Sequence, residues 1–206
     1  ITMKEYIPYL ERLRAAVDQA MAEDGGQPAR RTQAIVVVHR GRIVAERYAA
    51  DVGVDTLLPS HSMAKSVTHA LIGVLAQQGR LAPDAPLPFA PWQQQPGDPH
   101  AAITPNQLLA NASGLPWDER HYGGDLATRL WFDAPDPAAM AASLPLVAAP
   151  GAQFGYSNAG WIVLSRVIRD LNGGSAAPTM DFVHRELLAP LGMQHTELSF
   201  DATGTP

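Results

Sequence analysis

The sequence predicts a mixed α/β (α+β) fold, with an antiparallel sheet flanked by helices and a further all-helical region. Three observations favour this class. Apolar residues recur at helical spacing in several segments, residues 33–48 have the pattern of a β-hairpin, and 18 prolines and 17 glycines are scattered along the 206 residues. Because these turn-forming residues are not clustered into a linker, we expect a single domain without internal repeats.

The N-terminal region is expected to form a helix followed by the hairpin. Residues 3–23 carry apolar side chains every three or four positions, which predicts a packing helix. Strands are expected at 34–38 and 43–48, joined by a turn at 39–42. An isolated two-stranded hairpin is marginally stable, so these strands need further partners.

The next helix begins near Ser62 and runs to about Gln78, where Gly79 ends it. Its apolar stripe has the i, i+3, i+4, i+7, i+8 spacing of a half-buried helix and consists of Val67, Ala70, Leu71, Val74 and Leu75. On the opposite, polar face Ser62 and Lys65 are one turn apart, so their side chains are expected to be neighbours.

Ser62 and Lys65 together could perform nucleophilic catalysis. A serine hydroxyl is a weak nucleophile until a base takes its proton, and lysine can serve as that base when it is neutral. About one S-x-x-K match is expected by chance in a chain of this length, so an exposed serine beside a solvated lysine is the alternative. The chain has thirteen arginines but only two lysines, Lys4 and Lys65. Arginine does not release its proton near neutral pH, so a base at this position has to be lysine.

The remaining chain alternates short helices with loops. The proline-rich stretch from 81 to 99 is expected to be an irregular connection, and Thr104, Pro105 and Gln107 predict a capping box that opens a short helix. Residues 117–137 form a loop-rich region whose aromatic residues either line a cleft or fill a small local core. Helices are expected at about 161–171 and 178–188, followed by a turn at 190–193.

A second group of reactive side chains precedes the helix at 161–171. Tyr156 could pass a proton between a nucleophile and a leaving group, and Asn158 could direct its amide toward the same cleft. On local grounds alone, the alternative is that Ser157 or Asn158 caps the following helix.

Five segments stand in a fixed order and carry the strongest signal: the hairpin, residues 62–66, 103–116, 150–160 and 188–193. With S-x-x-K as the first motif and Tyr-x-Asn as the second, the sequence resembles the serine beta-lactamases and penicillin-recognising enzymes. It is most similar to the class C-like branch, which includes esterases, D-aminopeptidases and 6-aminohexanoate-dimer hydrolases. Residues 62–66 in particular resemble the last of these subgroups.

The resemblance implies a beta-lactamase-like fold and a serine hydrolase acting through an acyl-enzyme on a small or short-peptide amide or ester. Ser62 would be the nucleophile, Lys65 would activate it, Tyr156 would shuttle protons, and Asn158 would hold Lys65 or a substrate amide. The Ser62 backbone N–H would be one oxyanion-hole donor. A binding or sensor domain that is acylated without efficient turnover is the alternative.

The C-terminal part of the chain departs from the family pattern. The resemblance implies a third motif, Lys-Thr-Gly or a relative containing His and Gly, on a strand that lends a second oxyanion donor. Nothing after Asn158 matches it, and Thr203-Gly204-Thr205 lies too close to the end. We therefore expect residues 1–206 to be the N-terminal part of a single beta-lactamase-like domain. The missing C-terminal strands would come from a longer chain or from a second polypeptide.

Composition argues against several other classes. The net charge is -5 and there is no basic run, which argues against nucleic-acid binding. The sequence has no apolar run of eighteen residues, so we expect no membrane span. The absence of cysteine excludes disulfides and thiolate chemistry. We expect no metal or cofactor, because H-E-x-x-H is absent and the seven histidines lack ligand spacing. A Ser-His-Asp enzyme stays open, although residues 155–160 are one residue too long for a G-x-S-x-G elbow. The location is not determined, with a bacterial periplasmic or secreted protein favoured over a cytoplasmic one.

Overall fold

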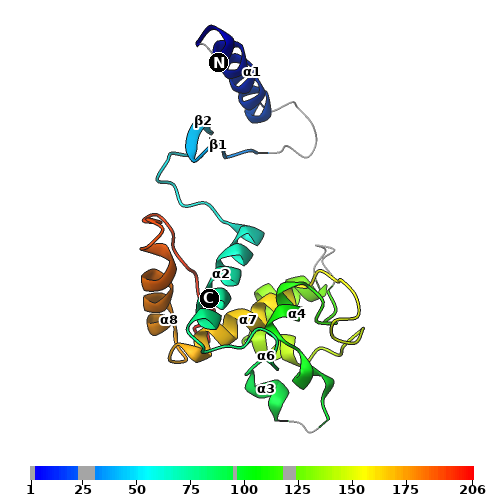
Figure 1. Ribbon diagram of the computed structural model, residues 1–206. Helices are drawn as coiled ribbons and strands as arrows, with labels where there is room; N and C mark the ends of the chain where they lie inside the picture. The colour runs from blue at the N-terminus through cyan, green and yellow to red at the C-terminus, as the bar shows by residue number, and fades with distance from the viewer. Residues whose placement is uncertain (1–2, 23–30, 95–96, 118–123) are drawn as a thin grey trace. The chain divides into compact units, whose positions relative to one another are not determined.

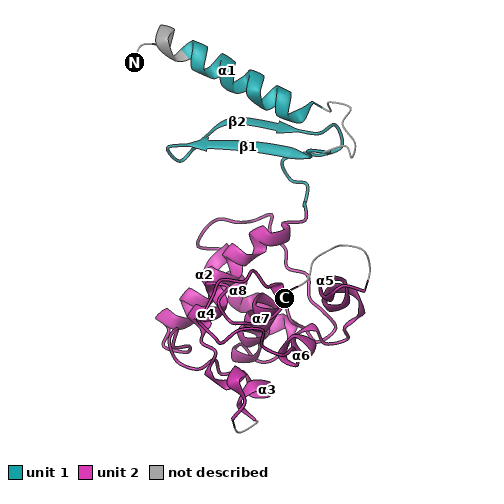
Figure 2. Ribbon diagram, turned by 90° about the vertical axis from the view of Figure 1, so that its right-hand side faces the viewer, with its two compact units in different colours: residues 1–58 teal, residues 59–206 magenta. Residues whose placement is uncertain are grey.

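The computed structural model describes residues 3–22, 31–94, 97–117 and 124–206. The chain falls into two compact units, residues 1–58 and residues 59–206 (Figure 2). The first unit contains α1 (Met3–Met21), β1 (Ala34–His39) and β2 (Arg42–Tyr48). No helix in the described part of the chain is both long and apolar enough to cross a membrane.

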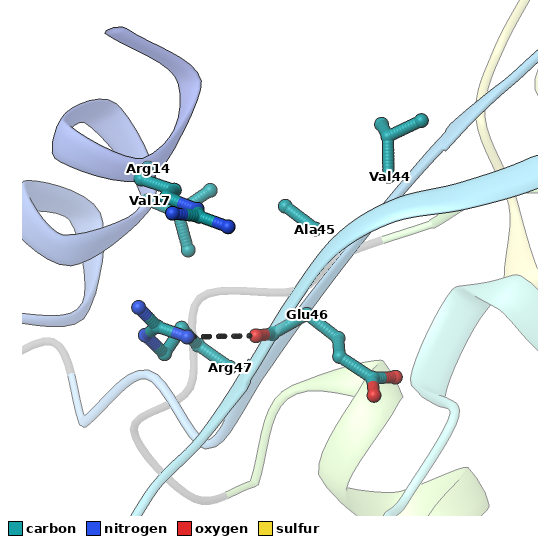
Figure 3. Close-up of a pocket in the computed structure, with 6 residues that line it drawn as sticks. All are labelled: Arg14, Val17, Val44, Ala45, Glu46 and Arg47. Carbon is teal, nitrogen blue, oxygen red and sulfur yellow. Dashed lines mark hydrogen bonds between the residues drawn. The ribbon is translucent and has the colours of Figure 1, made fainter. Parts of the chain in front are cut away.

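In the first unit, α1 packs against both strands of the hairpin. The strands pair antiparallel, with a register shift between Val37 and Val38. Arg40 and Gly41 both have positive φ, 49° and 74°, as a two-residue hairpin turn requires. Figure 3 shows a pocket that is lined by residues of both α1 and β2, among them Val17, which is 5% exposed, and Ala45. Arg47 donates to the backbone carbonyl of Glu46 at 3.4 Å. The sequence-predicted helix and hairpin are both present.

The second unit is helical (Figure 1). Its elements are η1 (His61–Met63), α2 (Ala64–Gln77), α3 (Ala90–Gln93), η2 (Pro99–Ala102), α4 (Pro105–Leu109), α5 (Leu126–Thr128), η3 (Arg129–Asp133), α6 (Pro137–Ala142), α7 (Asn158–Leu171), α8 (Ala176–Val183) and η4 (His184–Leu188). An antiparallel strand pair together with this helical unit confirms the predicted mixed fold class.

Helix α7 forms the centre of the second unit. It contacts α2, α4, α6 and α8. Its apolar side chains are almost completely removed from solvent and include Ala159, Val163, Leu164, Val167 and Ile168, none more than 1% exposed. Asn158 and Arg166 of the same helix are also buried, so α7 is enclosed on most sides. The short helices around α7 provide that enclosure.

The connection from 81 to 104 is more ordered than the sequence predicts. It contains α3 and η2, and it inserts Leu87, Phe89 and Trp92 into the core, each at most 1% exposed. The Trp92 indole N–H donates to the carbonyl of Ala142 at 3.2 Å. The predicted capping box at Thr104 is present, with Gln107 as its reciprocal partner. The prolines therefore shape turns that direct apolar side chains inward.

The region at 117–137 also contains helical turns, α5 and η3. The rings of Trp117 and Trp131 pack edge-to-face at 5.7 Å between centroids, and Trp117 packs against the core. Phe132 is 80% exposed. The aromatic residues thus divide between local packing and the surface, while Tyr122 lies outside the described residues.

Residues 201–205 are attached to α7 by a polar network. Arg166, 9% exposed, donates to Thr205 Oγ1 at 2.9 Å, to Thr203 Oγ1 at 3.0 Å and to Asp136 at 2.5 Å. Asp201 accepts from the backbone N–H groups of Thr203 and Thr205. Because a buried guanidinium without acceptors is costly, this network fixes the tail firmly in place.

We predict that Gly114→Ala destabilises the fold far more than Gly79→Ala. Both glycines have positive φ, 82° and 67°, but a Cβ on Gly114 would stand 2.1 Å from the Ala148 carbonyl oxygen, whereas Gly79 has open space. The expected losses are about 3–4 kcal/mol and about 1 kcal/mol respectively. Urea unfolding of the two variants measures both, and equal losses would contradict the close approach at Gly114.

Acidification below about pH 4 is expected to destabilise the fold. The pKa of Asp98 is lowered because the backbone N–H and ring of His100 donate to its carboxylate. Partial burial raises the pKa of Asp136, but hydrogen bonds from Arg166 and the Ala139 N–H outweigh it and lower the pKa. In the unfolded state these carboxyls have a pKa of about 3.9, so they bind protons at a higher pH than in the folded state. The stabilisation that the two lowered pKa values provide is therefore present above about pH 5 and is lost on acidification.

Urea midpoints at pH 6, 4 and 3 check this sign, and Asp98→Asn should reduce the acid-induced loss. A midpoint that rises as the pH falls would contradict the assignment.

Candidate active site

Ser62 lies at the start of the helical run formed by η1 and α2. Its Oγ is 3.2 Å from Lys65 Nζ, one turn further along. The predicted apolar stripe faces the core, with Leu71 and Leu75 at most 2% exposed, and Ile72 joins it. Packing of this stripe leaves Ser62 exposed and Lys65 half-buried on the opposite face.

The residue before Ser62 has an unusual backbone conformation. His61 has φ +45°, in the left-handed region that costs most non-glycine residues about 1–2 kcal/mol. It opens the 3₁₀ turn that presents Ser62. Strained backbone of this kind often occurs where a side chain has to be placed for function.

Tyr156 follows Ser62 by 94 positions in the sequence, and its hydroxyl lies beside that of Ser62. The Tyr156 Oη lies 3.0 Å from Ser62 Oγ and donates to Asn158 Oδ1 at 3.2 Å. Ser62, Lys65, Tyr156 and Asn158 therefore form one connected cluster. The structure brings together all four residues that the sequence selects, while their catalytic roles stay predictions.

The loop that carries Tyr156 is held by hydrogen bonds to residues 111–116. The N–H groups of Gly151 and Gly155 donate to the carbonyls of Ala112 and Asn111, each at 2.7 Å. Ser157 Oγ donates to the Pro116 carbonyl at 3.0 Å. The segments 111–116 and 151–157 thus hold one another in place, and the second of them carries Tyr156.

The helix-capping alternative for Ser157 is wrong. Ser157 occupies the N-cap position of α7, but its side chain makes no capping hydrogen bond and is used for Pro116 instead. Asn158 is the first residue of α7, is 5% exposed, and accepts from Tyr156. The start of α7 therefore fixes Asn158 at the end of the cluster.

Two aromatic rings lie near Lys65. Its Nζ is 5.2 Å from the centroid of Tyr156 and 5.9 Å from that of Trp161. Among the described residues, no carboxylate pairs with Lys65. The sequence places Trp161 only at the start of the helix predicted at about 161–171. Its position one turn after Asn158 is the signal that could have placed it near the cluster.

A histidine–aspartate pair is present but does not support a Ser-His-Asp site. His100 Nδ1 is 2.6 Å from Asp98, while its Nε2 faces the Leu144 carbonyl at 2.9 Å rather than a serine hydroxyl. Ser157, the candidate elbow serine, is 2% exposed and bonded to Pro116. This pair serves local structure.

Chemically, the cluster offers a hydroxyl with two proton-transfer partners. A neutral lysine or a phenolate within hydrogen-bond reach can remove a serine proton, and the protonated partner can return it to a leaving group. No cofactor is required for either step.

The fold and this cluster define a protein of the serine beta-lactamase-like superfamily. The Beta-lactamase family model matches residues 13–206, and the chain belongs to this family. No curated protein matches the sequence.

Solved structures show the same fold. A beta-lactamase candidate from Bacteroides dorei DSM 17855 is 24% identical with a TM-score of 0.63, over 92% of this chain and 52% of that one. A candidate 6-aminohexanoate-dimer hydrolase from Bacillus anthracis is 24% identical, TM-score 0.58, over 75% and 43%. A D-stereospecific amidohydrolase from Streptomyces sp. is 24% identical, TM-score 0.56, over 73% and 46%. The chain thus spans about half the length of these relatives or less.

Replacing Ser62, which belongs to the cluster, and Ser157, which lies next to Tyr156 in the sequence, should have different effects on stability. Ser157→Ala leaves the Pro116 carbonyl without its donor and should cost about 1 kcal/mol of unfolding free energy. Ser62→Ala removes an exposed hydroxyl and should change stability by less than about 0.5 kcal/mol. Urea unfolding separates the two, and a larger loss for Ser62→Ala would show a structural role for that hydroxyl.

Proposed function

We propose that this chain carries the catalytic centre of a serine hydrolase that acts on amide or ester substrates through an acyl-enzyme. One observation carries the proposal: Ser62 Oγ lies within hydrogen-bond distance of both Lys65 Nζ, at 3.2 Å, and Tyr156 Oη, at 3.0 Å. The relatives described as a candidate 6-aminohexanoate-dimer hydrolase and a D-stereospecific amidohydrolase support an amide-cleaving activity.

In the first half-reaction, Ser62 Oγ attacks the substrate carbonyl carbon while Lys65, in its neutral form, takes the serine proton directly or through Tyr156. The first N–H groups of a helical run have no intrahelical acceptor, so the Ser62 N–H is free to donate to the developing oxyanion. Collapse of the intermediate breaks the C–N or C–O bond, and Tyr156 protonates the leaving group.

In the second half-reaction, water attacks the acyl-enzyme carbonyl. Its proton passes to the Tyr156–Lys65 pair, the acyl C–Oγ bond breaks, and Ser62 recovers its proton. Asn158 orients the Tyr156 hydroxyl through the 3.2 Å hydrogen bond. This role differs from the contact with Lys65 or substrate that the family resemblance implies.

A complete site in this proposal requires further strands. The hairpin leaves Val36, Val38 and Ile43 between 50% and 61% exposed, an apolar surface suited to packing against additional polypeptide. We propose that further polypeptide, covalently continuous or a second chain, supplies the second oxyanion donor. Intact mass of active protein together with a search for a second polypeptide tests this, and activity from a single 22 kDa species would contradict it.

The catalytic roles are tested with p-nitrophenyl acetate and intact-protein mass spectrometry. Wild-type protein that includes the further polypeptide completing the site should release p-nitrophenol continuously. Ser62→Ala should abolish release and the adduct, and Lys65→Met should slow acylation by roughly 100- to 10,000-fold, the range of a general base. Ser66→Ala changes an exposed serine one turn further along the same helix and is the matched control, with no change expected.

The outcomes distinguish a hydrolase that turns over from a domain that is only acylated. A persistent stoichiometric adduct on Ser62 would favour a binding or sensor domain that is acylated without turnover. No release and no adduct would contradict both. Release that survives Ser62→Ala would place the nucleophile elsewhere.

A further inference from the structure

Lys65 is bordered by an aromatic ring that is itself held in one orientation. Its Nζ lies 5.9 Å from the centroid of Trp161, and the indole N–H of Trp161 donates to Asn111 Oδ1 at 3.0 Å. Trp161 belongs to α7, while Asn111 follows α4. A side chain whose polar end is bonded to another element keeps few rotamers, so the Trp161 ring is held in one orientation beside Lys65 Nζ.

Asn111 is suited to this task by its backbone. It has φ +54°, a left-handed conformation that asparagine adopts more readily than most residues. Its carbonyl accepts from the Gly155 N–H at 2.7 Å, which places it under the loop carrying Tyr156. The same residue therefore orients Trp161 with its side chain and the Tyr156 loop with its main chain.

We propose that Trp161 is a positioning residue that confines Lys65 within reach of Ser62, and that Asn111 orients Trp161 for this purpose. The inference rests on the proposed function of Lys65. A lysine side chain is a flexible four-carbon stem that ends in a mobile amine group. The aromatic faces of Trp161 and Tyr156 restrict the positions that this group can take. Confinement raises the fraction of molecules with Nζ near Ser62 Oγ.

The first test compares a variant without an aromatic face with one that keeps it. Trp161→Leu should lower the acylation rate constant of p-nitrophenyl acetate by on the order of 10- to 100-fold with KM little changed, because misplacing a reacting group has effects of this size. Trp161→Phe retains a ring face but loses the hydrogen bond to Asn111, so its rate constant should lie between those of Trp161→Leu and wild type. Equal losses in the two variants would overturn the proposal.

A second test is independent of catalysis. In protein labelled with [ε-¹³C]lysine, the Hε cross-peak that disappears in Lys4→Arg belongs to Lys4, and the one that disappears in Lys65→Arg belongs to Lys65. Aromatic ring currents should place that peak upfield of the Lys4 peak. Trp161→Leu should shift it downfield, whereas Trp161→Phe should retain part of the upfield shift.

Asn111 is tested with a pair that preserves its backbone conformation. Asn111→Gly keeps φ +54° accessible but removes the acceptor of the Trp161 N–H, whereas Asn111→Asp keeps an acceptor. Only the glycine variant should move the Lys65 peak in the direction of Trp161→Leu. Urea unfolding of each variant confirms that it is folded under the conditions used.

The two proposals fail in different ways. A protein that never acylates Ser62, yet shows the expected Lys65 shifts, would refute the proposed function and leave the confinement of Lys65 supported. A Lys65 peak that does not respond to Trp161→Leu would refute the positioning role even if Ser62 is acylated normally.

Discussion

The candidate site depends on the enclosure of α7. This helix is buried on most sides, so α2, α4, α6 and α8 have to pack around it in one arrangement. The packing of α2 against α7 sets Ser62 and Lys65 relative to Tyr156 and Asn158, which lie just before and at the first residue of α7. Residues separated by 94 positions in the sequence meet at 3.0 Å because both are attached to this core.

The features that could be predicted from the sequence are those controlled by neighbouring residues. The capping box at Thr104 and the hairpin turn at 39–42 depend on local backbone chemistry, and the sequence predicted both. The Ser62–Lys65 pair follows from helical spacing alone. Its meeting with Tyr156 required long-range information, which only the resemblance of the whole motif order supplied.

The features that were missed depend on partners distant in the sequence. Leu87, Phe89 and Trp92 lie in a proline-rich stretch without periodicity, so nothing local indicated that they are buried. The use of Ser157 was also unpredictable, because Pro116 offers its carbonyl from a different segment. The role of Trp161 was hidden because an aromatic residue on an apolar helix face looks like ordinary core.

Arginine and lysine have separate roles in this chain. Arg80, Arg166 and Arg169 each donate to backbone or side-chain oxygens that join different segments, and a planar guanidinium with five donors suits that purpose. Lys65 donates to one hydroxyl and otherwise faces aromatic rings. The arginines thus act as structural connectors, whereas in the proposed mechanism the lysine exchanges a proton with Ser62.

The left-handed conformation of His61 limits how the region around Ser62 can vary. Position 61 should accept glycine, asparagine and aspartate far more readily than valine, isoleucine or threonine, whose branched side chains are strained at φ +45°. A saturation library at this position would then show a narrow set of survivors although the side chain is exposed. In directed evolution, position 61 would therefore allow only a small set of residue types next to the candidate nucleophile.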